Sequence, residues 1–89
     1  MHDHLDISAR IEALLFFKGE AVTIDFLAKT LKISEDEVQS GLGALEQALA
    51  GRGIVLLRNG DEVMLGTAPQ MGATIEGLLK EELNNEKNE

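Results

Sequence analysis

The sequence contains no cysteine, no tryptophan and no tyrosine, and it has a single proline. Without cysteine there can be no disulfide bond, thiol nucleophile or cysteine-ligated zinc ribbon, and this composition is compatible with a cytosolic protein. Only three of the 89 residues are phenylalanine, so the core must be built from Leu, Ile, Val and Ala. The glycines form no phosphate-binding loop, because the Gly-Leu-Gly at 41–43 falls inside a predicted helix.

Basic residues are also scarce. Eight Lys and Arg stand against sixteen Asp and Glu, which gives a formal net charge of -8. This charge argues against nucleic acid and anionic membrane surfaces as partners. No apolar run approaches the roughly 20 residues that a membrane-spanning helix needs, and the acidic N-terminus does not resemble a signal peptide. We therefore expect a cytoplasmic protein with no membrane partner.

The length of the chain limits its domain organisation. Eighty-nine residues allow one domain, and a domain of that size buries only roughly 60% of its unfolded-chain surface, so it gains from a partner or a second copy. We expect a folded domain over residues 7–83. A flexible segment over 1–6 precedes it, and a disordered acidic tail over 84–89 follows it.

Apolar periodicity and capping residues predict three helices in the first half of the chain. The first begins near Ser8, which can cap it, and ends at Gly19. A short second helix follows the cap residue Thr23. The third has the strongest local signal, a capping box formed by Ser34 and Glu37. The buried stripes expected on the first and third helices are Ile7, Ile11, Leu14 and Leu15, and Val38, Leu42, Leu45 and Leu49.

A β-hairpin follows the three helices. Two apolar runs, 54–58 and 62–67, flank Asn59-Gly60, a pair that is typical of a type I′ turn because both central residues need positive φ. Helical spacing returns over residues 70–83. The order α-α-α-β-β-α predicts an α+β fold that is mostly α, the winged helix-turn-helix.

The third helix lacks the charge that a DNA-binding winged helix needs. Residues 34–49 contain no Lys or Arg and carry four acids: Glu35, Asp36, Glu37 and Glu46. DNA phosphates are normally met by Lys and Arg, so we expect protein–protein contact and no specific DNA binding. The acids of the first turn are either a solvated cluster that suits the helix dipole or an electrostatic guide for a basic partner.

The first helix has a second apolar face, formed by Ala9, Ala13 and Phe16 with Phe17 alongside. Two interpretations stay open. The last helix or the wing could cover this face, because a helix that is apolar all round is usually buried. Alternatively the face is a dimer interface, where aromatic side chains often contribute most of the binding energy.

Catalysis and metal binding have little support. There is no Cys or Tyr, and both histidines, His2 and His4, lie at the N-terminus on either side of Asp3. Ligands this close on a flexible end do not define a coordination geometry. These residues are therefore interpreted either as a mobile terminus or as a metal site. We expect no enzyme activity, no cofactor and no metal.

Several short motifs occur in an order shared with a known family. They are Leu14-Leu15-Phe16 with Gly19-Glu20, Leu27-Ala28, the capped acidic turn from Ser34 to Glu37, Gly53-Ile54 with Leu56, and Thr67 with Pro69. In this order and spacing the chain resembles the N-terminal domain of segregation and condensation protein B. The resemblance covers about residues 11–80 and does not extend to the second winged helix of that family.

The resemblance implies a non-enzymatic dimerisation and adaptor domain of the bacterial chromosome-condensing complex, acting in chromosome segregation, the cell cycle and cell division. It implies a homodimer that binds the kleisin subunit and, through it, the coiled-coil ATPase, and that joins the nucleoid through these partners. In the family, the second domain carries much of the kleisin contact. The alternative is a winged-helix domain of a DNA-binding transcription regulator.

Overall fold

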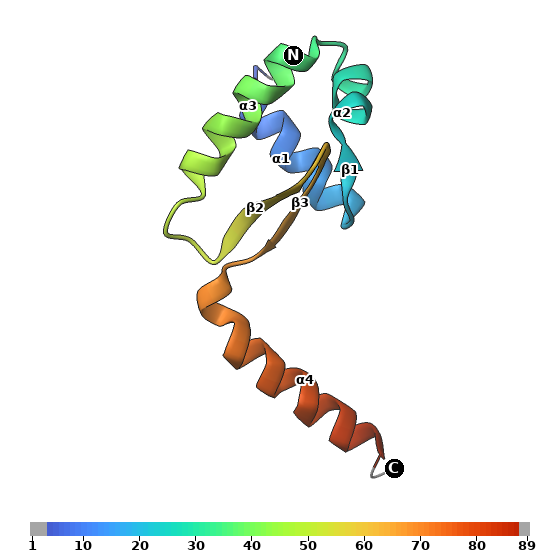
Figure 1. The fold of residues 1–89 in the computed structure, drawn as a ribbon, viewed down its shortest axis with the longest axis vertical. Helices are drawn as coiled ribbons and strands as arrows, with labels where there is room; N and C mark the ends of the chain where they lie inside the picture. The colour runs from blue at the N-terminus through green and yellow to red at the C-terminus, as the bar shows by residue number, and fades with distance from the viewer. Residues whose placement is uncertain (1–3, 88–89) are drawn as a thin grey trace.

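The computed structural model describes residues 4–87 and shows a small body of helices and strands from which one helix projects (Figure 1). In chain order the elements are α1 (Ile7–Lys18), β1 (Val22–Thr23), α2 (Ile24–Leu31), α3 (Glu35–Ala48), β2 (Ile54–Asn59), β3 (Glu62–Thr67), the 3-10 helix η1 (Pro69–Met71) and α4 (Gly72–Lys87). The predicted order of helices and hairpin is confirmed, with β1 as an additional strand.

The N-cap of α1 differs from the prediction. Ser8 is already helical, and the cap is Asp6, whose Oδ1 accepts the Ala9 amide and the Ser8 hydroxyl at 3.0 Å each. The carboxylate also suits the positive end of the helix dipole. At the other end Gly19 takes the left-handed conformation, with φ of 66°, and donates its N–H to Leu15, so the predicted end of this helix is confirmed.

The predicted caps of α2 and α3 are both present. Thr23 Oγ1 accepts the amide of Phe26 at 3.0 Å. Ser34 and Glu37 form the full capping box, because each side chain accepts the other residue's backbone N–H at 3.0 Å. Lys32 and Ile33 alone separate the end of α2 from the Ser34 cap of α3.

The turn of the hairpin lies one residue further along the chain than predicted. Asn59 pairs with Glu62, so the two loop residues are Gly60 and Asp61, and only Gly60 has positive φ. This pattern fits a type II′ turn, in which glycine takes the first central position. The Asp61 carbonyl accepts the amide of Ile24 at 2.9 Å, and this contact with the start of α2 selects the observed register.

Strand β1 ties the hairpin to the helices. The sheet order is β1-β3-β2, with Val22 opposite Val63 and Thr23 opposite Glu62, and both pairings are antiparallel. The side chains of Val22 and Val63 are buried. Two residues are too few to give a strand signal in the sequence, so this element was not predicted.

The core lies between α1, α2, α3 and β3. Both predicted stripes face it: Ile11 and Leu15 are fully buried, with Ile7 and Leu14 packed beside them, and all four predicted α3 residues are buried. At Gly41 the two helices approach so closely that a Cβ atom would lie 2.6 Å from Ile7 Cγ2. Close approach is therefore the reason for this glycine, whereas Gly43 has no atom within 4 Å of its Cβ position.

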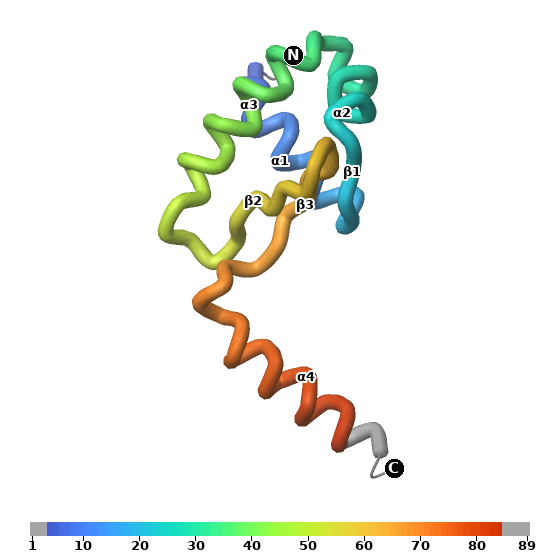
Figure 2. The backbone as a smooth tube through the Cα atoms, in the orientation of Figure 1, coloured from blue at the N-terminus to red at the C-terminus, as the bar shows by residue number. Residues whose placement is uncertain are grey.

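Helix α4 leaves the body and runs away from α1 (Figures 1 and 2). Its main contact within the described residues is with η1, and the molecule reaches 50 Å along its longest axis. The helix continues to Lys87, past Leu83, where the sequence places the end of the domain. Residues 84–87 of the expected tail are therefore helical, and residues 1–3 and 88–89 lie outside the described residues.

The two glycines of α3 provide a matched stability test. We expect Gly41→Ala to destabilise the fold by about 1–3 kcal/mol, because its methyl group would overpack against Ile7 and Ile11. Gly43→Ala should stabilise it by up to about 1 kcal/mol through helix propensity. Urea denaturation followed by circular dichroism measures both. Equal effects of the same sign would contradict the observed α1–α3 packing.

Candidate functional site

The second apolar face of α1 is open to solvent. The side chains of Phe16 and Phe17 are 81% and 82% exposed, Ala13 is exposed and Ala9 is half-buried. Neither α4 nor the wing covers this face, so the interpretation of a covered face is wrong within the described structure. Exposed phenylalanines on adjacent positions are typical of an interaction surface.

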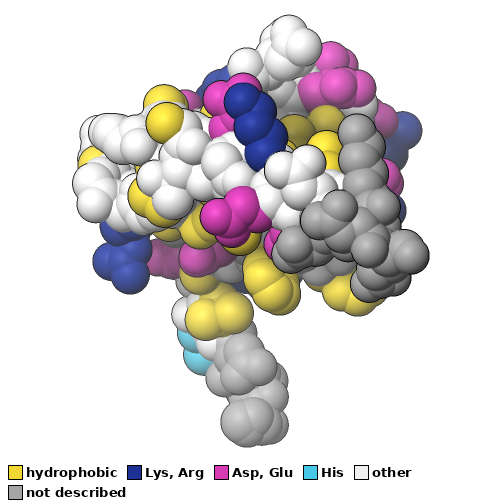
Figure 3. Space-filling view, turned by 90° about the horizontal axis from the view of Figure 1, so that it is seen from below, with side chains coloured by type: hydrophobic (Ala, Val, Ile, Leu, Met, Phe, Trp, Pro, Cys, Tyr) yellow, Lys and Arg dark blue, Asp and Glu magenta, His cyan; other side chains and the backbone are white. Residues whose placement is uncertain are grey.

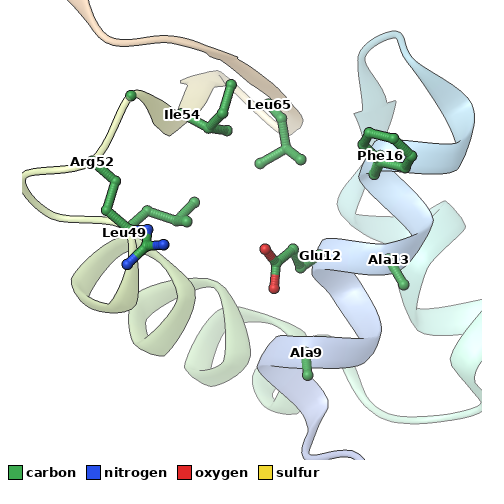
Figure 4. A pocket seen from close by; sticks show the side chains of 9 residues that line it. Ala9, Glu12, Ala13, Phe16, Leu49, Arg52, Ile54 and Leu65 are labelled. Atoms are coloured by element: carbon green, nitrogen blue, oxygen red, sulfur yellow. The ribbon is translucent and has the colours of Figure 1, made fainter.

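Three of these residues form one side of a groove of about 570 Å³. Ala9, Ala13 and Phe16 line it from α1, and Phe17 does not contribute to it. The opposite side comes from Leu49 after α3, from Ile54 of β2 and from Leu65 of β3 (Figure 4). Sequence reasoning did not include the opposite side, because the fold alone brings these three apolar positions next to α1. We call this the α1 groove.

Two charged residues also line the α1 groove. Glu12 enters from α1, and Arg52 comes from the loop between α3 and β2 (Figure 4). Within the described residues neither side chain takes part in a salt bridge. The groove is therefore an apolar surface with an unpaired acid on the helix side and an unpaired base on the loop side.

Hydrophobic side chains reach the surface in several places besides the groove. Seen from below, they lie among acidic and neutral side chains, while Lys and Arg are scattered (Figure 3). The outer side of the hairpin exposes Leu57, and α4 exposes Leu78, Leu79 and Leu83. Basic side chains form no continuous patch on the face shown.

The basic residue of the hairpin is turned toward α3. Arg58 Nε lies 3.2 Å from Glu46 Oε2, and its Nη1 donates to Gln39 Oε1 at 3.0 Å. This pair holds the wing against the third helix. Arg58 is the one basic residue among residues 54–67, and its guanidinium is bonded to α3 rather than turned out toward a phosphate.

The structure adds no support for a metal site. Among residues 4–87, no group of three His, Cys, Asp or Glu side chains could hold a metal ion. His2 and Asp3 of the candidate N-terminal site lie outside the described residues. None of the helices in the described part of the chain is both long and apolar enough to span a membrane.

Comparison with known proteins identifies the family. Residues 9–89 match the family model of the segregation and condensation complex subunit ScpB. The chain belongs to this family. It is 35% identical to segregation and condensation protein B of Carboxydothermus hydrogenoformans over 78 residues, which are 85% of this chain and 42% of that protein. The protein of the same name from Clostridium botulinum (strain Kyoto / Type A2) is 39% identical over 72 residues, 79% of this chain and 37% of that protein.

Two solved structures share the fold. A dimer of the ScpB N-terminal domain complexed with a ScpA peptide matches with a TM-score of 0.71 and 30% identity, covering 80% of this chain and 91% of that chain. ScpB from Mycobacterium tuberculosis matches with a TM-score of 0.76 and 26% identity, covering 91% of this chain and 54% of that chain. The predicted winged helix and the predicted family are thereby confirmed. The chain spans about two fifths of the length of the curated ScpB relatives above.

The charge distribution predicts that this ScpB-family chain does not bind duplex DNA. Ordinary non-specific binders have dissociation constants of roughly 10⁻⁴–10⁻⁶ M at physiological salt, and we expect weaker binding here because α3 has no basic residue. Fluorescence anisotropy with a labelled duplex measures this. Micromolar affinity at physiological salt would contradict the expectation and favour the transcription-regulator alternative.

Proposed function

We propose that this chain is a non-enzymatic dimerisation and adaptor domain of a bacterial chromosome-condensing complex, and that it acts by protein–protein contact. The observation that carries the proposal is the uncovered face of α1, where two phenylalanines are more than four fifths exposed. A small domain with a limited core gains stability when a second copy covers such a face.

Membership of the ScpB family supports this role. A solved ScpB N-terminal domain is described as a dimer, and dimers of identical chains usually bury the same patch on both copies. We propose such an isologous interface through Ala9, Ala13, Phe16 and Phe17. In that arrangement these side chains are buried against the other copy, and the desolvated phenylalanines supply most of the binding energy.

The kleisin is the proposed second partner. The solved ScpB dimer is complexed with a ScpA peptide, and we propose that this chain likewise binds the kleisin subunit and thereby joins the coiled-coil ATPase. The low content of basic residues supports a role at the chromosome through proteins rather than through direct DNA contact. Such a role would place the chain in the cytoplasm, at the nucleoid.

Substitution of the exposed phenylalanines tests the dimer. We expect wild type to sediment as a dimer at micromolar concentration, and Phe16→Glu and Phe17→Glu to shift it toward the monomer, because each places a charge in a desolvated contact. Gln47→Glu adds a similar charge at an exposed position of α3 and should leave the dimer intact. Circular dichroism verifies that each variant is folded. A wild-type monomer at high micromolar concentration, or a dimer tolerant of both glutamates, would refute the proposal.

Binding of the kleisin has its own test. A labelled ScpA peptide from the same genome should raise its anisotropy saturably when wild-type chain is added, and a scrambled peptide of equal charge should not. Absence of binding at high micromolar chain would remove the kleisin from the proposed role of this chain. It would leave the dimer proposal in place, because that proposal depends on sedimentation alone.

A further inference from the structure

Helix α4 presents an apolar stripe that nothing in the described structure covers. Leu78, Leu79 and Leu83 are 53–59% exposed, and Ile75 on the same face is only half-buried. The spacing i, i+3, i+4, i+8 places all four on one side of the helix. An isolated helix of 16 residues is marginally stable in water, because packing of an amphipathic face supplies most helical stability. We therefore expect the stripe to pack against another apolar surface.

The α1 groove of the same chain is out of reach. The Ala68 N–H is bonded to the Gly53 carbonyl at 2.8 Å, and the Met71 N–H is bonded to the Ala68 carbonyl at 2.9 Å. Pro69 restricts φ in the same turn, and η1 continues directly into α4. This connection sets the direction of α4, which runs away from α1 (Figure 1). The helix cannot bend back without breaking the turn that begins it.

We propose that α4 of one copy lies in the α1 groove of a second copy, and that the second copy returns the same contact. An amphipathic helix that places i, i+4 and i+7 side chains in an apolar groove is a common recognition mode. Exchange of identical elements makes it self-complementary. The inference deepens the proposed dimer and rests on it, since it names the element of the partner copy that covers Ala9, Ala13 and Phe16.

Charge complementarity supports this occupant. Glu82 lies seven residues after Ile75 and so falls on the apolar face of α4. The α1 groove offers one base, Arg52, which forms no salt bridge with another described residue. Pairing Glu82 with Arg52 directs the C-terminal half of α4 toward the loop at 51–53 and away from Glu12 on the α1 side (Figure 4). The pair therefore specifies the orientation of the helix in the groove.

The absence of native cysteine makes a disulfide test specific. A chain with Ala13→Cys is mixed with a differently tagged chain with Leu79→Cys, equilibrated and oxidised. We expect the mixed disulfide dimer to exceed both single-variant dimers several-fold. Two control mixtures are matched to this pair. In the first, the Ala13→Cys chain is mixed with an Asn84→Cys chain, whose cysteine is on the opposite side of α4. In the second, the Leu79→Cys chain is mixed with a Gln47→Cys chain, whose cysteine is on α3. Each control should lose most of the mixed product.

A charge swap tests the orientation on the chain without cysteine. Arg52→Glu should weaken dimerisation about tenfold, because it places two acids together in a partly desolvated contact. Adding Glu82→Arg to the same chain should restore most of the loss. A double variant as weak as Arg52→Glu alone would overturn the Glu82–Arg52 pairing.

The outcomes separate this inference from the proposed function. An intramolecular disulfide in a chain carrying both cysteines would show closure onto its own groove and would overturn the exchange. If the disulfide dimer of the Leu79→Cys chain with itself is the main product, the exchange is overturned and the α4 helices of the two copies pair with each other. A sedimenting dimer without the mixed disulfide overturns the exchange and retains the dimer. A wild-type monomer overturns both.

Discussion

The close packing of α1 on α3 determines which surfaces this domain exposes. Gly41 allows Ile7 and Ile11 to sit directly against the third helix, and Ile11 and Leu15 then occupy the centre of the core. Because this contact uses one side of α1, its other side, with Phe16, must face outward. The hairpin returns beside the same helix and converts that outward face into a groove. The close approach at Gly41 thus contributes both to the core and to the outward orientation of the candidate site.

Three polar contacts join the hairpin to α2 and α3. Ile24 donates to the Asp61 carbonyl at 2.9 Å and holds the tip at the start of α2, while Arg58 binds Glu46 and Gln39 of α3. In a DNA-binding winged helix, basic side chains of these elements would be available to phosphates. Here Arg58, the basic residue of the wing, binds side chains of α3 instead. The fold is that of a winged helix, but α3 carries no basic side chain and the one basic side chain of the wing is bonded to α3.

The parts that were predictable from sequence are those decided by neighbouring residues. The Ser34–Glu37 capping box, the Gly19 stop and the apolar stripe of α3 all depend on local spacing, and each is confirmed. Tertiary contacts decided the rest. The Asn-Gly-Asp sequence allows two turn registers, and contact with α2 selects one of them. The second apolar face of α1 was identified from its pattern, but the pattern left open whether that face is covered. Leu49, Ile54 and Leu65 could not be assigned to it, since only the fold brings them there.

The balance of buried and exposed apolar residues links stability to assembly. Within the described residues, twelve hydrophobic side chains are buried and nine large ones are exposed. Hydrophobic burial is the main favourable term in folding, at about 25 cal/mol per Å², so a domain that leaves this much apolar surface uncovered forgoes much of its available stabilisation. Seven of the nine exposed ones lie on α1, the hairpin and α4. A partner that covers these surfaces binds only the folded domain, so its binding also stabilises the fold. Burial of apolar surface thus contributes both to folding and to complex formation.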